Sequence, residues 1–99
     1  MTKKDWLARL HVNLRLRCTY RWYAPNCDEV IVLTHVGTRM AEYRIEQTNR
    51  ENAPRKHLRL DFPRAPHVRA IPGGFELLKE DGSLMSRYLW IEEEGVNAA

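Results

Sequence analysis

Long apolar runs are missing from this chain of 99 residues. The longest aliphatic stretch covers only residues 30–33, whereas a helix needs roughly 20 apolar residues to cross a bilayer. The basic start at residues 1–4 is followed by Asp5 and Arg9, which interrupt the apolar segment that a secretory signal requires. These absences predict a cytoplasmic protein that has no membrane partner.

A second independent core is also excluded, because 99 residues and 11.7 kDa suit one domain. The apolar share of 43% and the charged share of 29% are globular proportions, which argues against a disordered chain. We therefore expect one small globular domain over residues 1–99, too short for a large multi-domain enzyme.

Cysteine is scarce, since only Cys18 and Cys27 occur, nine residues apart. This spacing makes neither a Cys-x-x-Cys redox motif nor a four-ligand zinc pattern, and the four histidines are scattered. We expect no metal and no cofactor. Two free buried thiols are the expected state, although the spacing leaves a single disulfide open.

Catalytic motifs are missing as well, because the chain has no phosphate-binding Gly-Lys loop and no Gly-x-Ser-x-Gly elbow. The sequence therefore predicts a non-enzymatic protein without catalytic residues. One metal-free enzyme stays open as an alternative: a ribonuclease that uses His57, Lys56, Arg59 and His67 as base and cationic groups.

Positive charge comes mainly from arginine, because only 4 of the 16 basic side chains are lysines and the formal net charge is +3. Residues 50–69 carry +4 and residues 70–99 carry −4, so the chain has a basic middle and an acidic tail. The planar guanidinium fork suits phosphates, carboxylates and aromatic faces, which indicates a binding surface.

The clearest structural pattern is an alternation with a period of two over residues 10–23, which predicts one long amphipathic strand. A helix is the alternative for this segment, because helical spacing would place Leu7, Leu10, Leu14 and Cys18 in one apolar stripe. The positions expected on the buried face of the strand are Leu10, Val12, Leu14, Leu16, Cys18, Tyr20 and Trp22. The opposite face receives His11, Asn13, Arg15, Arg17, Thr19, Arg21 and Tyr23.

Further alternating or β-branched stretches predict strands over residues 29–34, 39–47 and 57–62, with a brief edge strand over 68–71. Asp81-Gly82 predicts a hairpin with a two-residue loop that pairs Glu76 with Arg87 and Phe75 with Tyr88. A helix starting at Leu84 is the alternative. Near the start, a capping pattern predicts a short helix over residues 3–9.

These elements predict a mainly β fold, all-β or α+β. It consists of a small antiparallel sheet of five or six strands that curls into a barrel or sandwich, with a short N-terminal helix.

The candidate site is a row of arginines on the polar face of the first strand. Arg15, Arg17 and Arg21 are expected to project together as a cationic ridge that follows a phosphate backbone, with Tyr23 stacking on a base. The basic middle of the chain is expected to extend this patch through Arg55, Lys56, Arg59 and Arg64.

The most direct interpretation is a binder that contacts the phosphate backbone of a nucleic acid, largely without sequence readout. The alternative is a protein-interaction module, for example a small inhibitor or adaptor of a nucleic-acid-handling complex. Its anchors would be Trp6, Trp22 and Trp90, since tryptophan and arginine are enriched at interface hot spots.

Overall fold

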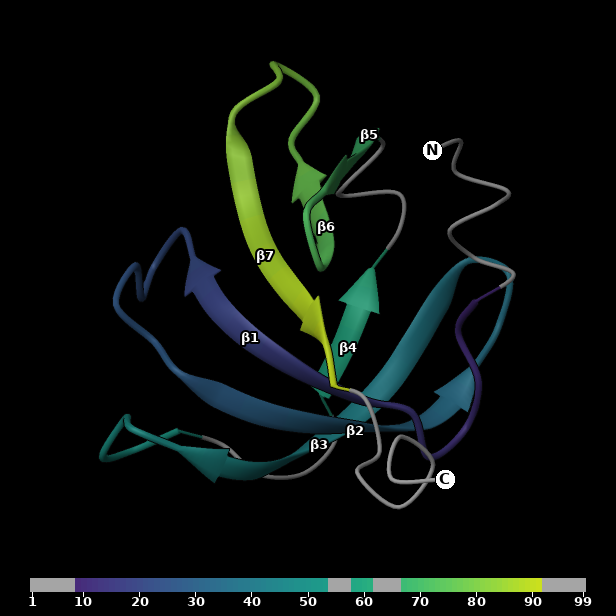
Figure 1. Ribbon diagram of the computed structural model, residues 1–99, viewed down its shortest axis with the longest axis vertical. Coiled ribbons are helices and arrows are strands. Elements are labelled where there is room, and N and C mark those ends of the chain that lie inside the picture. The colour runs from purple at the N-terminus through teal and green to yellow at the C-terminus, as the bar shows by residue number, and fades with distance from the viewer. Residues whose placement is uncertain (1–8, 54–57, 62–66, 92–99) are drawn as a thin grey trace.

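The computed structural model describes residues 9–53, 58–61 and 67–91, which form seven strands (Figure 1). The strands are β1 (Arg15–Arg21), β2 (Glu29–Val36), β3 (Met40–Thr48), β4 (Leu58–Asp61), β5 (His67–Ile71), β6 (Gly74–Leu78) and β7 (Leu84–Trp90). The predicted mainly β fold is confirmed. Within these three ranges there is no helix, and so none that is long and apolar enough to cross a bilayer. The helix expected over residues 3–9 lies outside the described residues, apart from its last position.

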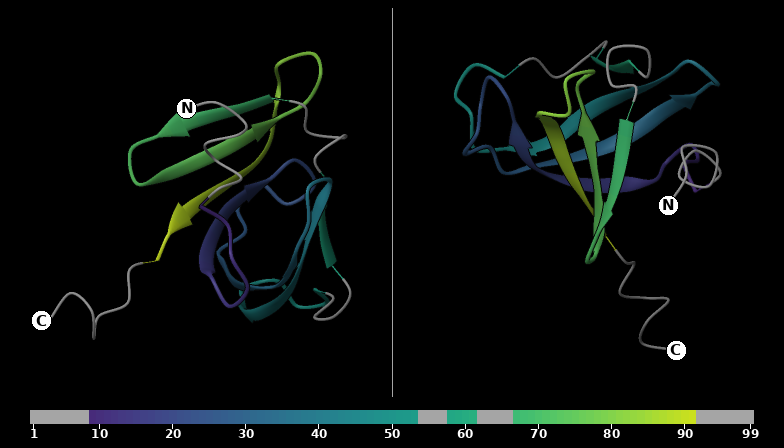
Figure 2. Two further views of the ribbon diagram at one scale, coloured as in Figure 1. Left: turned by 90° about the vertical axis from the view of Figure 1, so that its right-hand side faces the viewer. Right: turned by 90° about the horizontal axis from the view of Figure 1, so that it is seen from above.

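All seven strands belong to one antiparallel sheet in the order β4-β3-β2-β1-β7-β6-β5. Two meanders, β1–β4 and β5–β7, are joined in the middle of the sheet where β1 pairs with β7. Figure 2 shows that the sheet is strongly curved, as the sequence indicated. The sheet is nevertheless open, because β4 and β5 are its two ends, and it has seven strands instead of five or six.

Side chains from both arms of the curved sheet meet in one buried core. Ile31 of β2 lies opposite Ile45 of β3, and both are buried. On the other arm, Phe75 of β6 stacks on Tyr88 of β7 with 5.3 Å between ring centroids. At the first position of β6, a Cβ on Gly74 would overlap the backbone of Tyr88. The close approach of β6 and β7 at this point therefore requires a glycine.

The β6–β7 hairpin confirms the cross-strand pairs that the sequence predicted. Glu76 lies opposite Arg87, and Phe75 lies opposite Tyr88. The helical alternative from Leu84 is wrong, because this residue begins strand β7.

The loop of this hairpin is longer than the predicted two residues. The Lys79 amide donates to the Ser83 carbonyl oxygen at 2.8 Å, which leaves three loop residues, 80–82. Gly82 adopts a φ of 87°, the positive φ typical of the last residue in such a loop. A register shift beside Leu78 compensates for the extra residue, so the pairs further along the strands are those of the shorter loop.

Strand β1 begins later than the alternation predicted. The Leu14 amide donates to the His11 carbonyl oxygen at 3.1 Å, and Asn13 has a positive φ of 74°, so this segment forms a turn. The strand starts only at Arg15. Val12 was expected to be buried, but it lies in the turn and is 50% exposed.

A bulge in β1 changes which side chains face the core. The register against β7 shifts between Cys18 and Tyr20, so Thr19 is an extra residue on the β1 side. Because side chains alternate along a strand, one extra residue exchanges the two faces beyond it. Arg21 is therefore buried and Trp22 is 56% exposed, the reverse of the prediction.

Candidate binding surface

The predicted cationic ridge is interrupted by ion pairs. Arg15 and Arg17 are exposed, as expected, but Arg15 pairs with Glu46, and Nη1 of Arg17 lies 2.7 Å from Oδ1 of Asp28. The prediction that Arg21 shares their face is wrong, because the Thr19 bulge turns its side chain inward. Two acid-paired arginines thus remain of the proposed row of three.

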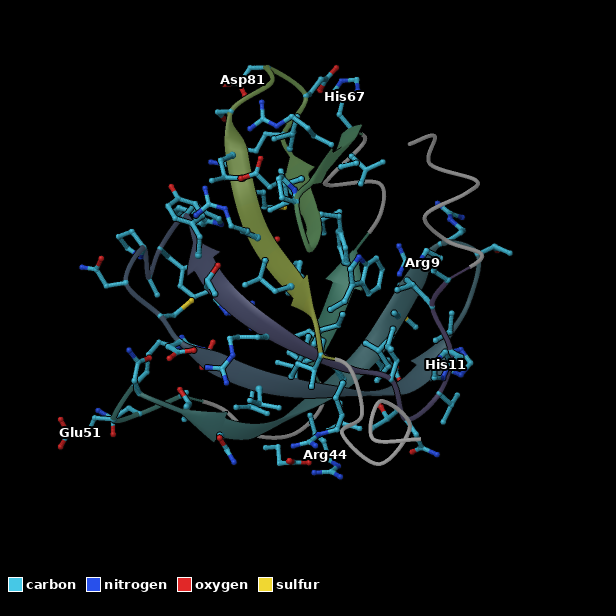
Figure 3. All side chains as sticks on the ribbon, in the orientation of Figure 1. Arg9, His11, Arg44, Glu51, His67 and Asp81 are labelled. Carbon is cyan, nitrogen blue, oxygen red and sulfur yellow. The ribbon has the colours of Figure 1, made fainter. Side chains whose placement is uncertain are left out.

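The other predicted cations are mostly not described. Arg59 lies in β4 as the backbone partner of Glu42. Outside the described residues lie Arg55, Lys56, Arg64 and, for the ribonuclease hypothesis, His57. His67 is exposed at the start of β5, at the end of the molecule opposite Arg44 (Figure 3).

The three tryptophans have different environments. Trp6 lies outside the described residues. Trp90 is partly buried, because its ring centroid lies 5.1 Å from that of Phe75 and Arg9 covers it at 3.9 Å. Of the two tryptophans that the structure describes, Trp22 is the one that is largely exposed.

Arg21 belongs to a buried ion cluster, which we call the inner clamp and define as Arg21, Glu29 and Arg50. Glu29 is fully buried at the start of β2. Its Oε1 accepts hydrogen bonds from Nε of Arg21 at 2.8 Å and Nη2 of Arg50 at 3.1 Å. Thr48 donates to the other carboxylate oxygen. One carboxylate therefore holds two guanidinium groups, and the cluster has a net charge of +1.

The surroundings of Glu29 decide its protonation. Burial by itself raises the pKa of this carboxyl, but the hydrogen bonds from Thr48, Arg21 and Arg50 and the charge of Arg21 together outweigh burial, so the pKa lies below its ordinary value of 4.5. Nη2 of Arg21 is the single buried side-chain nitrogen or oxygen of the described residues without a hydrogen-bond partner. Glu29 is thus the carboxylate that balances the buried charge of Arg21.

A second cluster, the outer clamp, consists of Arg69, Glu76 and Arg87 and joins β5, β6 and β7. Oε1 of Glu76 accepts from Nη2 of Arg69 at 2.6 Å, and Oε2 accepts from Nε of Arg87 at 2.8 Å. Burial raises the pKa of Glu76, and the bonds from Arg87 and Arg69 overcome this effect and lower it. This cluster also has a net charge of +1, and its arginines face solvent.

Among the residues that the structure describes, the most exposed aromatic side chains lie together in the β1–β2 loop. Trp22 and Tyr23, which we call the aromatic tip, are each 56% exposed. Their rings meet edge to face, with 5.3 Å between centroids. Nζ of Lys79 lies 4.7 Å from the Trp22 ring, and Arg50 lies 5.7 Å from the Tyr23 ring. Two aromatic rings are thus flanked by two cations.

Backbone hydrogen bonds hold the aromatic tip in place. The Trp22 amide donates to the Met85 carbonyl oxygen of β7 at 3.0 Å. The Ala24 amide donates to the Arg21 carbonyl oxygen at 2.9 Å, which closes a tight turn. A shallow open depression of about 290 Å³ lies next to this turn, lined by Ala24, Pro25, Asn26, Cys27, Asn49 and Arg50. The tip is therefore fixed to β7 and borders a recess.

Cys18, Cys27 and Glu29 are buried side by side, with their ligand atoms within 4.8 Å of one another. Such a group has the donor types of a metal site. Both oxygens of Glu29 already accept hydrogen bonds from protein groups, including two guanidinium groups. A metal cation here would have to displace these bonds beside the charge of Arg21, so the cluster fits a metal ion poorly.

Sequence reasoning placed Tyr23 on the exposed face, where the structure has it, but it missed the exposure of Trp22, because strict alternation placed Trp22 on the buried face. A usable signal was present in the turn residues Tyr23-Ala24-Pro25, since turns and loops lie at the protein surface and expose the side chains beside them.

Comparison with models of protein families, with curated proteins and with solved structures found no match for this chain.

Proposed function

We propose that this protein is a non-enzymatic binding module that contacts single-stranded nucleic acid through the aromatic tip. The observation that carries the proposal is the pair of adjacent rings, each 56% exposed and each accompanied by a cation. Stacking of bases on exposed aromatic rings, combined with nearby positive charge, is how such strands are held without sequence preference.

Electrostatics support the same partner. Lys79 lies beside Trp22, and the inner clamp, with its net charge of +1, reaches the tip through Arg50. The chain as a whole carries +3. A phosphate backbone passing the tip would therefore meet positive charge on either side of the stacked rings.

The test measures binding of a fluorescently labelled mixed-sequence oligonucleotide, as DNA and as RNA, by anisotropy at several salt concentrations. Trp22→Ala is expected to weaken binding by roughly 5- to 150-fold, the range for removing one stacking partner. The matched control is Val12→Ala, because Val12 is similarly exposed at the other end of β1 and should leave the affinity unchanged. Equal effects of the two substitutions would contradict the proposal.

Lys79 provides an independent readout of phosphate contact. Lys79→Gln should reduce the slope of log affinity against log salt by about 0.7, the value for one phosphate contact on a single strand. Arg15→Ala and Arg17→Ala should weaken binding less than Trp22→Ala, because both arginines are paired with acids. A larger effect of these two arginines would return the site to the originally predicted ridge.

A protein partner is the second candidate, favoured by the depression beside the tip. Tryptophan, tyrosine and arginine around a recess are typical of interface hot spots. If no oligonucleotide binds at low salt, the aromatic tip becomes the anchor of a protein-interaction module, an inhibitor or adaptor.

A further inference from the structure

The two cysteines face each other in the core beside the β1–β2 loop. Sγ of Cys18 lies 3.9 Å from Sγ of Cys27. Cys18 lies in β1, and its backbone partner on β2 is Glu29, two residues after Cys27. A disulfide bond is about 2.05 Å long, so the sulfurs would have to approach by about 1.9 Å.

The two thiols differ in their access to solvent. Both cysteines are buried, but Cys27 is 4% exposed and lines the open depression of about 290 Å³, whereas Cys18 is fully buried and does not line it. The Cys18 thiol donates to the Tyr20 carbonyl oxygen at 3.5 Å, and the Cys27 thiol lies 3.8 Å from the Cys18 carbonyl oxygen. A small reagent in the depression therefore meets Cys27 before Cys18.

We propose that Cys18 and Cys27 form a reversible oxidation site, in which a small-molecule disulfide converts the thiol pair into an intramolecular disulfide. The Cys27 thiolate attacks one sulfur of the reagent, forming a mixed disulfide and expelling one small thiolate. Cys18 releases its proton to water, and its sulfur attacks Sγ of Cys27 and expels the second small thiolate. The protein loses two electrons and two protons, and the reagent is reduced to two thiols.

Burial raises the pKa of Cys18 to about 12, although the nearby charge of Arg21 acts in the opposite direction. This burial slows the attack by Cys18, since only the thiolate attacks, while the short distance between the two sulfurs favours it. The closed ring would contain Trp22 and Tyr23, but the oxidation site does not depend on what these residues bind.

The experiment exposes the reduced native protein to graded ratios of oxidised to reduced glutathione at neutral pH, blocks the remaining thiols by alkylation and measures the whole-protein mass. The native chain should lose two hydrogens at a ratio at least roughly tenfold lower than the chain unfolded in urea, because the fold holds the sulfurs together. Retention of two alkylatable thiols at ratios that oxidise the unfolded chain would overturn the proposal.

Single substitutions separate the two steps. Cys18→Ala should stop at a stable glutathione adduct on Cys27, and Cys27→Ala should take up no glutathione while folded, as judged by circular dichroism. Preferential modification of Cys18 in the Cys27→Ala protein would contradict entry through the depression. The wild-type measurement decides the proposal even if a variant fails to fold.

Discussion

The two halves of the sheet each contain one glutamate held by two arginines, and they differ in how much of that cluster water reaches. In the inner clamp, the side chains of Arg21 and Arg50 are 5% and 21% exposed. In the outer clamp, those of Arg69 and Arg87 are 58% and 38% exposed. Both glutamates are almost completely buried.

The comparison separates the pairing of charges from their desolvation. An exposed guanidinium that loses its carboxylate regains water, whereas a buried one keeps an unpaired charge in a medium of low dielectric. The inner clamp should therefore be the cluster on which the fold depends. The outer clamp should help to align β5, β6 and β7, but it should contribute only modestly to the unfolding free energy.

The largest expected effect comes from Glu29→Gln. This change leaves the charge of Arg21 buried without a counterion, which costs about 3–5 kcal/mol of unfolding free energy for a broken buried pair. Urea unfolding followed by circular dichroism measures the loss. Adding Arg21→Met removes the unpaired charge and should restore part of the stability. A double variant no more stable than Glu29→Gln alone would show that the buried charge is not the cause.

The inner clamp also shows where sequence reasoning stops. Period-two alternation located the strands, and the Asp81-Gly82 signal gave the Glu76–Arg87 pair, because cross-strand neighbours follow from local register. Alternation alone assigned Arg21 to solvent. Nothing in the residue types around Thr19 marks a bulge, since it arises from how β1 pairs with a strand far along the chain.

The exposure of Trp22 was missed for the same reason, since it follows from the same bulge, whereas the exposure of Tyr23 was predicted. The ion pairs of Arg15 and Arg17 were also hidden, because Glu46 lies on another strand and Asp28 lies beyond the loop. The sequence thus predicted strands and one hairpin register, while the candidate site required the long-range pairing of β1 with β7.

Acid provides the next largest effect and acts on both clamps. Hydrogen bonds lower the pKa values of Glu29 and Glu76 below 4.5 in the folded protein. Between those lowered values and 4.5, the unfolded chain binds more protons, so the unfolding free energy decreases as the pH falls through this window. Stability should be retained above pH 4.5 and lost below it, as measured by urea unfolding at stepwise lower pH.

Each glutamate should account for its own part of this acid sensitivity. The Glu29→Gln and Glu76→Gln proteins should both show a smaller decrease of stability with acid than the wild type, because each lacks one carboxylate that titrates. An unchanged pH slope in either variant would mean that the missing carboxylate is not a source of the acid effect.

The smallest expected effect comes from Glu76→Gln. Glutamine keeps one carbonyl oxygen for Arg69 or Arg87, and both guanidinium groups still contact water, so the loss should be about 1 kcal/mol, as for exposed ion pairs. The urea midpoint should shift slightly with an unchanged slope. If Glu76→Gln cost as much as Glu29→Gln, exposure of the arginines would not set the cost. The energy would then lie in the buried carboxylate, which the two clamps share.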